Sequence, residues 1–297
     1  MIRRLTLATA ILVWASGALH AQTTSAPVTP VEHDVTVLTY KIHYWEAGSG
    51  APVLLLHGTG GEGARWMPNI KGLGSDFHVF AIDQIGFGDS DKPLTNYHSG
   101  VMAEFAAGFL KAVGIERATV IGQSMGAGVA LYMAVHYPQM VDHLVLVDGG
   151  GVRSAVLSAP PATPNWHARQ IANAATREES LEYLKLLYYD HSRITDQMID
   201  DNLVLRLKSA FTIDKLSEAG GKGLGGVSEE EAANLKTPTL IVWGNQDRVA
   251  NPTGADRLSA AIPGSRKVMI DKASHYPFIE QADEFNQVVR DFLKPAY

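Results

Sequence analysis

Residues 120–128 read VIGQSMGAG. An apolar run with β-branched residues, typical of a strand, leads into Ser124, which has a glycine two positions away on each side. A helix-like segment follows at residues 126–136. G-x-S-x-G between a strand and a helix predicts a tight turn that lifts the serine hydroxyl clear of a sheet. The hydroxyl would then lie near a helix N-terminus, where free N–H groups favour negative charge, so Ser124 is the candidate nucleophile.

Short apolar runs and helix-like segments alternate on both sides of this motif. Strands followed by helices predict an α/β fold with a mostly parallel sheet that is covered on both faces. We count eight expected strands, which include two early strands between residues 35 and 48. The other six begin the segments 52–58, 78–91, 118–124, 143–151, 239–247 and 267–275, and helices are expected at 101–113, 126–136 and 283–293.

The alternation stops between residues 152 and 236, where no comparable apolar strand occurs. Leu181, Leu184 and Leu187 would share one face of a helix. A second helix is expected at 195–211, and a third begins after the capping-box pair Ser228 and Glu231. The interval therefore predicts a helical cap, or lid, inserted into an α/β core that consists of residues 32–151 and 237–297.

The N-terminal residues 1–21 have the pattern of a secretory signal, with two arginines, an apolar run and a small-residue cleavage site. The run is too short for a comfortable membrane span. Residues 22–31 are rich in threonine and proline and predict a flexible leader. We therefore expect a periplasmic or secreted protein with no stable membrane insertion after signal cleavage.

Composition excludes several classes of function and of stabilisation. The chain has no cysteine, so it has no disulfides. Its net charge of −6 argues against a nucleic-acid partner, which requires a basic face. The spacings H-E-x-x-H and G-x-x-x-x-G-K-[ST] are absent, and neither a metal nor a cofactor is expected.

A serine nucleophile needs a base and an acid that orients the base, and this kind of fold supplies them in the chain order serine, acid, histidine. Asp247 and His275 each follow an expected strand end, and such loops converge on one edge of a parallel sheet. Asp148 also follows a strand end and is the alternative acid. Asp83 and Asp271 share that position, and for both we expect a structural role in a turn.

The oxyanion that forms during acyl transfer needs two N–H donors. One would be the backbone N–H of Met125, the residue after the nucleophile, and the other would come from the loop after residues 53–56. Thr59 is the first choice in that loop and Gly60 the second. His57, which precedes the serine in the chain, is expected to shape the loop.

The chain resembles the α/β-hydrolase fold family through HGTGG, DQIGFGDSDKP, GQSMGAG, PTLIVWGNQD and SHYPFIEQADEFN, which appear in that order. Within it, the resemblance is closest to the hydrolases of meta-cleavage products, which split carbon–carbon bonds in ring-opened aromatics. Gln123 and Tyr276 replace that group's usual asparagine and tryptophan. In that group an arginine of the lid holds a substrate carboxylate, and Asn202 stands at its position here. Arg206, one helical turn later, would replace it only if the helix is rotated. A serine at position 124 disfavours the dehalogenase and epoxide hydrolase branches, which attack with a carboxylate.

These features predict a serine hydrolase that cleaves small carboxylic esters through an acyl-enzyme, with Ser124, His275 and Asp247 as the triad. Carbon–carbon bond hydrolysis of a dienoic keto acid and lactone opening are alternatives within the same chemistry. The alternative from another class is a ligand-binding member of the fold without catalysis.

Overall fold

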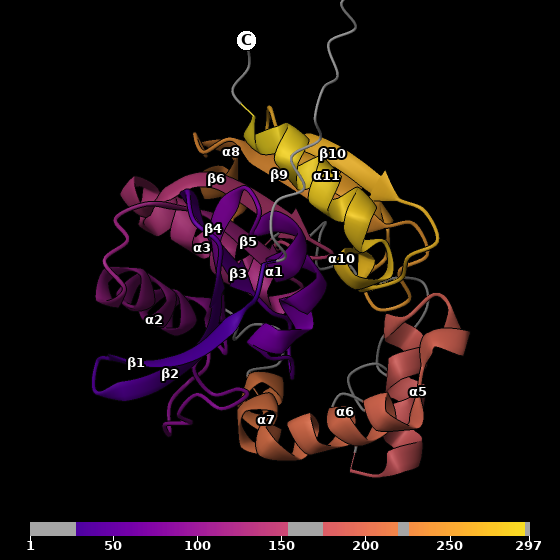
Figure 1. Ribbon diagram of the computed structural model, residues 1–297. Helices are drawn as coiled ribbons and strands as arrows, with labels where there is room; N and C mark the ends of the chain where they lie inside the picture. The colour runs from indigo at the N-terminus through magenta and orange to yellow at the C-terminus, as the bar shows by residue number, and fades with distance from the viewer. Residues whose placement is uncertain (1–27, 154–174, 219–225, 295–297) are drawn as a thin grey trace, which may run out of the picture.

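The computed structural model describes residues 28–153, 175–218 and 226–294, and these build the sheet shown in Figure 1. The predicted signal segment 1–21, most of the predicted leader and parts of the predicted cap lie outside the described residues. The eight-stranded, mostly parallel sheet is confirmed, in the order β1-β2-β4-β3-β5-β6-β9-β10. Among these strands only β2 runs opposite to the rest, because it pairs antiparallel with both β1 and β4. The strands are β1 Val31–Val37, β2 Tyr40–Ala47, β3 Ala51–Leu56, β4 Phe77–Ile82, β5 Ala118–Gln123, β6 Val141–Val147, β9 Thr239–Gly244 and β10 Arg266–Ile270.

Helices cover both faces of this sheet (Figure 1). On one face lie α2 Ser99–Ala112, α3 Met125–His136 and α9 Thr253–Ala261. On the other lie α1 Met67–Leu73, α10 Pro277–Glu280 and α11 Ala282–Leu293. Alternate residues of one strand therefore belong to different cores: Leu54 and Leu56 pack with α2 and α3, whereas Val53 and Leu55 pack with α1 and α11. Burial on both faces explains why the inner strands are continuous apolar runs rather than alternating ones.

The insertion is largely helical, with α5 Arg177–Leu187, α6 Asp196–Lys208, α7 Ala210–Glu218 and α8 Glu229–Ala233. The capping box of Ser228 and Glu231 is present at the start of α8. The helix expected at 195–211 ends at Lys208, and α7 begins after Ser209. A two-residue ladder was not expected: β7 Val152–Arg153 pairs with β8 Val227–Ser228 where the insertion leaves and rejoins the core. Such short strands have too few residues for a periodic signal, so only tertiary contact reveals them.

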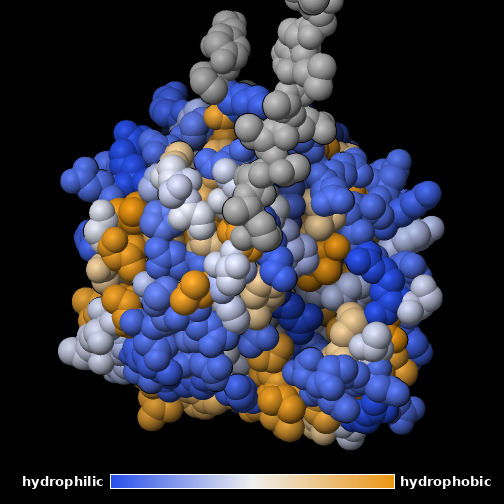
Figure 2. Space-filling model, viewed as in Figure 1, coloured by the Kyte–Doolittle hydropathy of each residue, from blue (hydrophilic) through white to orange (hydrophobic). Residues whose placement is uncertain are grey.

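The face shown in Figure 2 is mostly hydrophilic, with apolar side chains gathered at its lower edge, where Figure 1 places α6 and α7. Val204, Leu207 and Phe211 are the exposed large apolar residues of these two helices. Within the described ranges, no helix has the length and apolar character that crossing a bilayer requires.

Candidate active site

Ser124 occupies a strained turn between β5 and α3. Its backbone has φ 52° and ψ −113°, a region that residues with a side chain rarely adopt. The Ser124 N–H donates to the carbonyl of Val147 on the neighbouring strand at 2.8 Å, and its own carbonyl accepts from Ala127 in the first turn of α3. The residue therefore belongs neither to the strand nor to the helix, and its side chain is partly exposed while its neighbours in the chain are buried.

The glycines of the motif let the turn pack closely against the sheet. A Cβ at Gly122 would lie 2.1 Å from the carbonyl oxygen of Gly126, and a Cβ at Gly126 would lie 2.3 Å from that of Leu56. Real Cβ atoms essentially never approach this closely. The motif therefore brings the first turn of α3 against the end of β3, and this is the physical reason for both glycines.

His275 and Asp247 form a buried pair at the ends of β9 and β10. The distance between His275 Nδ1 and Asp247 Oδ2 is 2.8 Å, and the two residues are 4% and 7% exposed. The other carboxylate oxygen of Asp247 accepts the N–H groups of Val249 and Ala250 at 2.7 and 2.9 Å. Three donors therefore hold the carboxylate, which in turn fixes the orientation of the imidazole ring.

Asp148, the alternative acid, lies beside this pair. Oxygen or nitrogen atoms of Asp148, Asp247 and His275 all lie within 4.8 Å of one another. Asp148 Oδ1 accepts the N–H of Gly244 at 2.9 Å, whereas its Oδ2 is buried and accepts no hydrogen bond. Burial, and next the adjacent charge of Asp247, raise the pKa of Asp148 well above its usual value. Asp148 is thus the acid of the pair that is harder to ionise, and Asp247 is the acid that contacts the imidazole.

A side chain from the turn joins Ser124 to the histidine loop. Gln123 Nε2 donates to the backbone carbonyl of His275 at 3.1 Å, and Gln123 itself is buried. In the described part of the chain, the Ser124 hydroxyl and the His275 ring are not hydrogen-bonded to each other. Catalytic hydrogen bonds of this kind are often long without substrate and tighten when it binds. The structure therefore brings Asp247 and His275 into contact and connects the turn of Ser124 to them through Gln123.

The two expected oxyanion donors belong to the two chain segments next to Ser124. Met125 is the first residue of α3, and Thr59 follows Gly58, where a Cβ would lie 3.1 Å from the Cβ of Ser124. Within the ranges that the structure describes, neither the Met125 nor the Thr59 N–H donates a hydrogen bond to another residue. Gly60 has φ 66° and turns the loop immediately after Thr59. Neither N–H group therefore has an acceptor among the described residues, and the roles of Met125 and Thr59 as oxyanion donors stay predictions.

His57 shapes this loop. Its Nε2 accepts the backbone N–H of Gln84 at 3.0 Å, and its Nδ1 lies 2.7 Å from the Gly58 carbonyl, to which it must therefore donate. Only a neutral ring can make both bonds. Burial lowers the pKa of His57 to about 4, which keeps the ring neutral.

Two arginines lie where the cap meets the core. The Arg206 guanidinium of α6 is buried over the Tyr183 ring, 4.0 Å from its centroid, and a Cβ at Gly60 would lie 2.4 Å from its Nη1. Arg65 donates to Asn202 Oδ1 at 3.3 Å. Asn202 and Arg206 are both buried on the same face of α6. The expectation that Arg206 requires a rotated helix is therefore wrong, because residues four apart share one helical face.

Ser274 and Glu280 flank His275, and sequence reasoning missed both of them. Ser274 is completely buried, and Glu280 is 6% exposed. Burial raises the pKa of the Glu280 carboxyl, although three backbone N–H groups donate to it and oppose that rise. A charged residue five positions after a candidate base was the only signal in the sequence. Two of its partners, Tyr189 and Asp190, lie about 90 residues away and could not be identified from the sequence.

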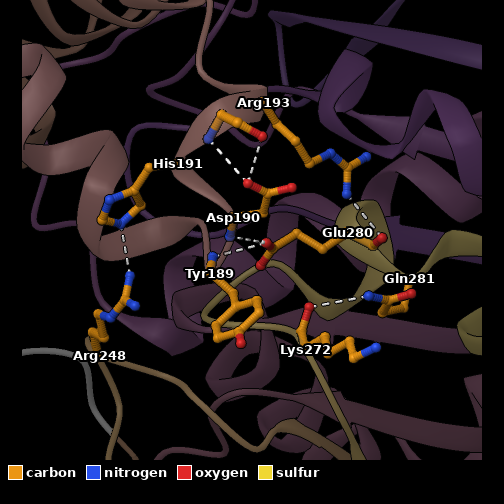
Figure 3. A pocket seen from close by; sticks show the side chains of 9 residues that line it. Tyr189, Asp190, His191, Arg193, Arg248, Lys272, Glu280 and Gln281 are labelled. Atoms are coloured by element: carbon orange, nitrogen blue, oxygen red, sulfur yellow. Dashed lines mark hydrogen bonds between the residues drawn. The ribbon is translucent and has the colours of Figure 1, made fainter.

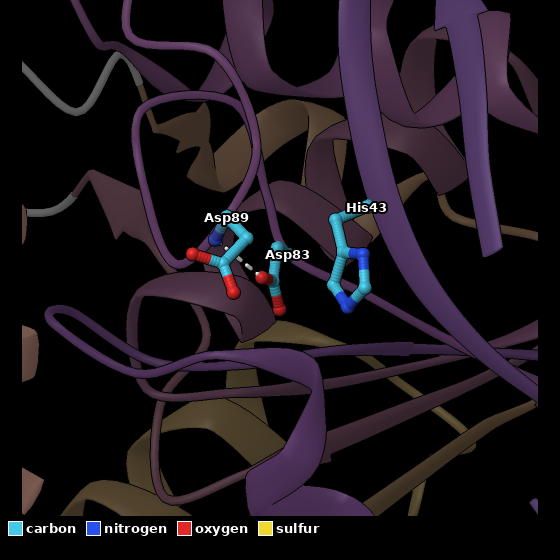
Figure 4. A group of neighbouring side chains, drawn as sticks. All are labelled: His43, Asp83 and Asp89. Carbon is cyan, nitrogen blue, oxygen red and sulfur yellow. Dashed lines mark hydrogen bonds between the residues drawn. The ribbon is translucent and has the colours of Figure 1, made fainter. Parts of the chain in front are cut away.

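Among the described residues, two groups of side chains have the composition of a metal site. One consists of Asp148, Asp247 and His275, which the hydrogen bonds above explain. The other consists of His43, Asp83 and Asp89 (Figure 4). Asp83 accepts the N–H groups of Gly63 and Asp89, and Asp89 is paired with Lys208 at 2.9 Å. These bonds give Asp83 the structural role in a turn that was expected of it.

Asp271, the other strand-end aspartate, is exposed and accepts a hydrogen bond from Asn245 Nδ2. This contact likewise fits the expected role in a turn.

Comparisons with known proteins agree with this geometry. A family model described as alpha/beta hydrolase fold matches residues 51–282. The chain is 32% identical over 268 residues to the 2-hydroxy-6-oxononadienedioate/2-hydroxy-6-oxononatrienedioate hydrolase of Cupriavidus pinatubonensis, which covers 86% of this chain and 91% of the relative. It is 34% identical over 260 residues to the dihydrolipoyllysine-residue acetyltransferase component of the acetoin cleaving system of Cupriavidus necator, over 85% of this chain but only 66% of that relative.

The solved structure of a meta-cleavage product hydrolase from Pseudomonas fluorescens is similar in fold. It has a TM-score of 0.79 and 27% identity, over 88% of this chain and 96% of that one. The match of the family model over most of the described chain, the eight-stranded sheet and the strained serine turn lead to one conclusion: the chain belongs to the alpha/beta hydrolase fold family.

Proposed function

We propose that this protein is a serine hydrolase that cleaves carboxylic esters with Ser124 as nucleophile, His275 as base and Asp247 as the orienting acid. The observation that carries the proposal is the buried contact of 2.8 Å between His275 and Asp247, connected through Gln123 to the turn of Ser124. No other described histidine has a buried carboxylate partner and also lies in a loop that is hydrogen-bonded to the turn of Ser124. A nucleophile, a base and an acid in this relation are the requirement for acyl transfer.

In the proposed reaction the Ser124 oxygen attacks the ester carbonyl while His275 Nε2 takes its proton. The Met125 and Thr59 N–H groups stabilise the tetrahedral oxyanion. His275 then gives its proton to the leaving alcohol, and an acyl-enzyme forms. Water activated by the same imidazole releases the acid, and Asp247 stabilises the imidazolium in both steps.

The test is hydrolysis of p-nitrophenyl butyrate together with fluorophosphonate labelling. Ser124→Ala should abolish both, and Asp247→Asn should lower kcat by about 10⁴-fold because the imidazole loses its correct tautomer. Asp271→Asn is the matched control, since it changes another strand-end aspartate, and should leave the rate unchanged. Labelling that persists in Ser124→Ala would overturn the assignment of the nucleophile. A wild-type protein that is never labelled would indicate a ligand-binding member of the fold.

A second activity, carbon–carbon bond hydrolysis of a dienoic keto acid, is favoured by one observation. Arg206 is buried beside the Gly60 loop, next to one expected oxyanion donor, and could pair with a substrate carboxylate. The hydrolase of Cupriavidus pinatubonensis carries the name of a dienedioate substrate. A ring-cleavage product assayed beside p-nitrophenyl butyrate and a simple lactone separates the possibilities. If Arg206→Gln lowers turnover of the acid but not of the neutral ester, the carboxylate role is supported.

We further propose that the chain is exported and that residues 1–21 are removed. The support is the pattern of charged, apolar and small residues at the start of the sequence. Mass spectrometry of the protein from its native host should find an N-terminus at Gln22. An intact N-terminus in the cytoplasmic fraction would contradict the proposal.

A further inference from the structure

The carboxylate of Glu280 connects the cap to the loop of the proposed base. Its Oε1 accepts the backbone N–H groups of Tyr189 and Asp190 at 2.8 and 3.3 Å, as Figure 3 shows. Its Oε2 accepts the N–H of Ser274 at 2.8 Å. Tyr189 and Asp190 follow α5 in the cap, and Ser274 immediately precedes His275. One buried carboxylate therefore holds two segments whose residues are about 85 positions apart.

The hydroxyl of Ser274 makes a second connection between the same parts. It donates to the carbonyl of Leu186, near the end of α5, at 2.7 Å, and it accepts the N–H of Arg248 at 3.2 Å. Arg248 immediately follows Asp247. The residue before the proposed base and the residue after the proposed acid are thus joined by one side chain, and both are joined to the cap.

The Arg248 side chain completes this arrangement. Its Nη1 donates to the carbonyls of Lys185 and Tyr188, both at 3.0 Å, at the C-terminal end of α5. The Lys185 carbonyl also lies 2.9 Å from His191 Nε2. A guanidinium in this place also interacts favourably with the helix dipole. The C-terminal end of α5 is therefore hydrogen-bonded to both loops that carry His275 and Asp247.

From this geometry we infer that Glu280 and Ser274 are positioning residues for the proposed reaction: they use the cap as a fixed support that holds His275 against Asp247. The inference rests on the proposed function for its rate effects. The hydrogen bonds of Ser274 and Glu280 act on the backbone at both sides of the 2.8 Å contact between the imidazole and the carboxylate. A small displacement there changes the direction in which His275 Nε2 points, and a misplacement of about 1 Å can cost about 100-fold in rate.

A cavity next to Glu280 bears on whether this residue acts on the substrate directly or by positioning His275. A cavity of about 480 Å³ is lined by Glu280, Arg193 and Arg248, among others (Figure 3). Among the described residues, its lining includes none of Ser124, Asp247 and His275. Glu280 therefore lies between this cavity and the loop of His275, and it acts through the backbone of Ser274.

The decisive variant is Glu280→Gln, which keeps the shape of the side chain but places an NH₂ group against at least one N–H donor. We expect kcat for p-nitrophenyl butyrate to fall by about 10- to 100-fold with KM nearly unchanged. Ser274→Ala removes the bonds to Leu186 and Arg248 and should act in the same direction. Arg193→Gln is the matched control, because Arg193 Nη1 donates to the backbone carbonyl of Glu280 at 2.9 Å and makes no hydrogen bond to its carboxylate.

If Glu280 only anchors the cap, Glu280→Gln and Arg193→Gln would change KM alike and spare kcat, and the inference would be overturned. An independent measurement is the low-field proton resonance of His275 Nδ1, assigned by its loss in His275→Gln. We expect this resonance to move in Glu280→Gln and Ser274→Ala but not in Arg193→Gln. If the resonance moves in neither Glu280→Gln nor Ser274→Ala, the inference is overturned, even if no substrate is found. A failure of the proposed function is seen separately, as a wild-type protein that the fluorophosphonate does not label. Should Glu280→Gln fail to fold, Ser274→Ala decides.

Discussion

Two glycines in the first turn of α3, Gly126 and Gly128, should respond in opposite ways to substitution by alanine. A Cβ at Gly126 would lie 2.3 Å from the carbonyl oxygen of Leu56 and 2.6 Å from that of His57. A Cβ at Gly128 would meet only Ser99 Oγ at 3.6 Å and the Gly151 Cα at 3.7 Å, which are ordinary contacts. Both changes give the helix a residue with a better intrinsic propensity, by about 1 kcal/mol.

The expected magnitudes follow from where the first clash occurs. The atoms that a methyl group at Gly126 meets are backbone, so the N-terminus of α3 must move away from β3 by roughly 1 Å, since a close-packed interior has no spare room. Overpacking of this kind costs about 1–3 kcal/mol of stability. The movement also separates the Met125 N–H from the loop of Thr59, and the loss of one oxyanion donor costs about 10²–10³ in kcat.

Urea unfolding and p-nitrophenyl butyrate hydrolysis, measured on Gly126→Ala and Gly128→Ala side by side, test this reasoning. Gly126→Ala should lose at least about 100-fold in kcat and be less stable than the wild type. Gly128→Ala should keep the wild-type rate and gain about 1 kcal/mol. Wild-type turnover in Gly126→Ala, or an equal loss in both variants, would refute the argument.

Three further predictions concern strain and protonation. Ser124→Gly should end fluorophosphonate labelling yet raise the unfolding free energy by about 1 kcal/mol, because glycine adopts φ 52° without strain; a less stable variant in urea unfolding would contradict this. Burial and the charge of Asp247 raise the pKa of Asp148 in the folded protein, so as pH rises this carboxyl loses its proton in the unfolded chain before it does so in the folded one. The free energy of unfolding therefore declines as pH rises above the pKa that Asp148 has in the unfolded chain. The advantage of Asp148→Asn in urea unfolding should therefore grow between pH 4 and pH 7, and a constant difference would sink the prediction. Burial lowers the pKa of His57 to about 4, so as pH drops this imidazole takes up a proton in the unfolded chain before it does so in the folded one. The free energy of unfolding should therefore fall by up to roughly 3 kcal/mol between pH 6.5 and pH 4. His57→Asn should flatten that decline, and an unchanged pH profile would speak against it.

The sequence by itself determined the architecture. Short continuous apolar runs that end in glycine or aspartate identify strands buried on both faces, because such strands lack the alternation of a half-exposed sheet. The helices between them identify the parallel connections, and G-x-S-x-G at one junction identifies the turn of Ser124. Asp247 and His275 could also be identified from the sequence, because their chain order and their positions at strand ends suffice to place them at one edge of the sheet.

Only the tertiary structure decided how those positions are divided among roles. Asp148 and Asp247 both follow strand ends, so the sequence favours Asp247 but leaves Asp148 as an alternative. In the structure the Asp148 carboxyl faces the N–H of Gly244 and the Asp247 carboxyl faces His275. The pairing of β7 with β8, the buried face shared by Asn202 and Arg206, and the bonds from Glu280 to the cap depend likewise on contacts between distant segments. Local periodicity reports which face of an element is buried but not which partner covers it, since hydrogen bonds and burial depend on distances in space that a position in the chain does not encode.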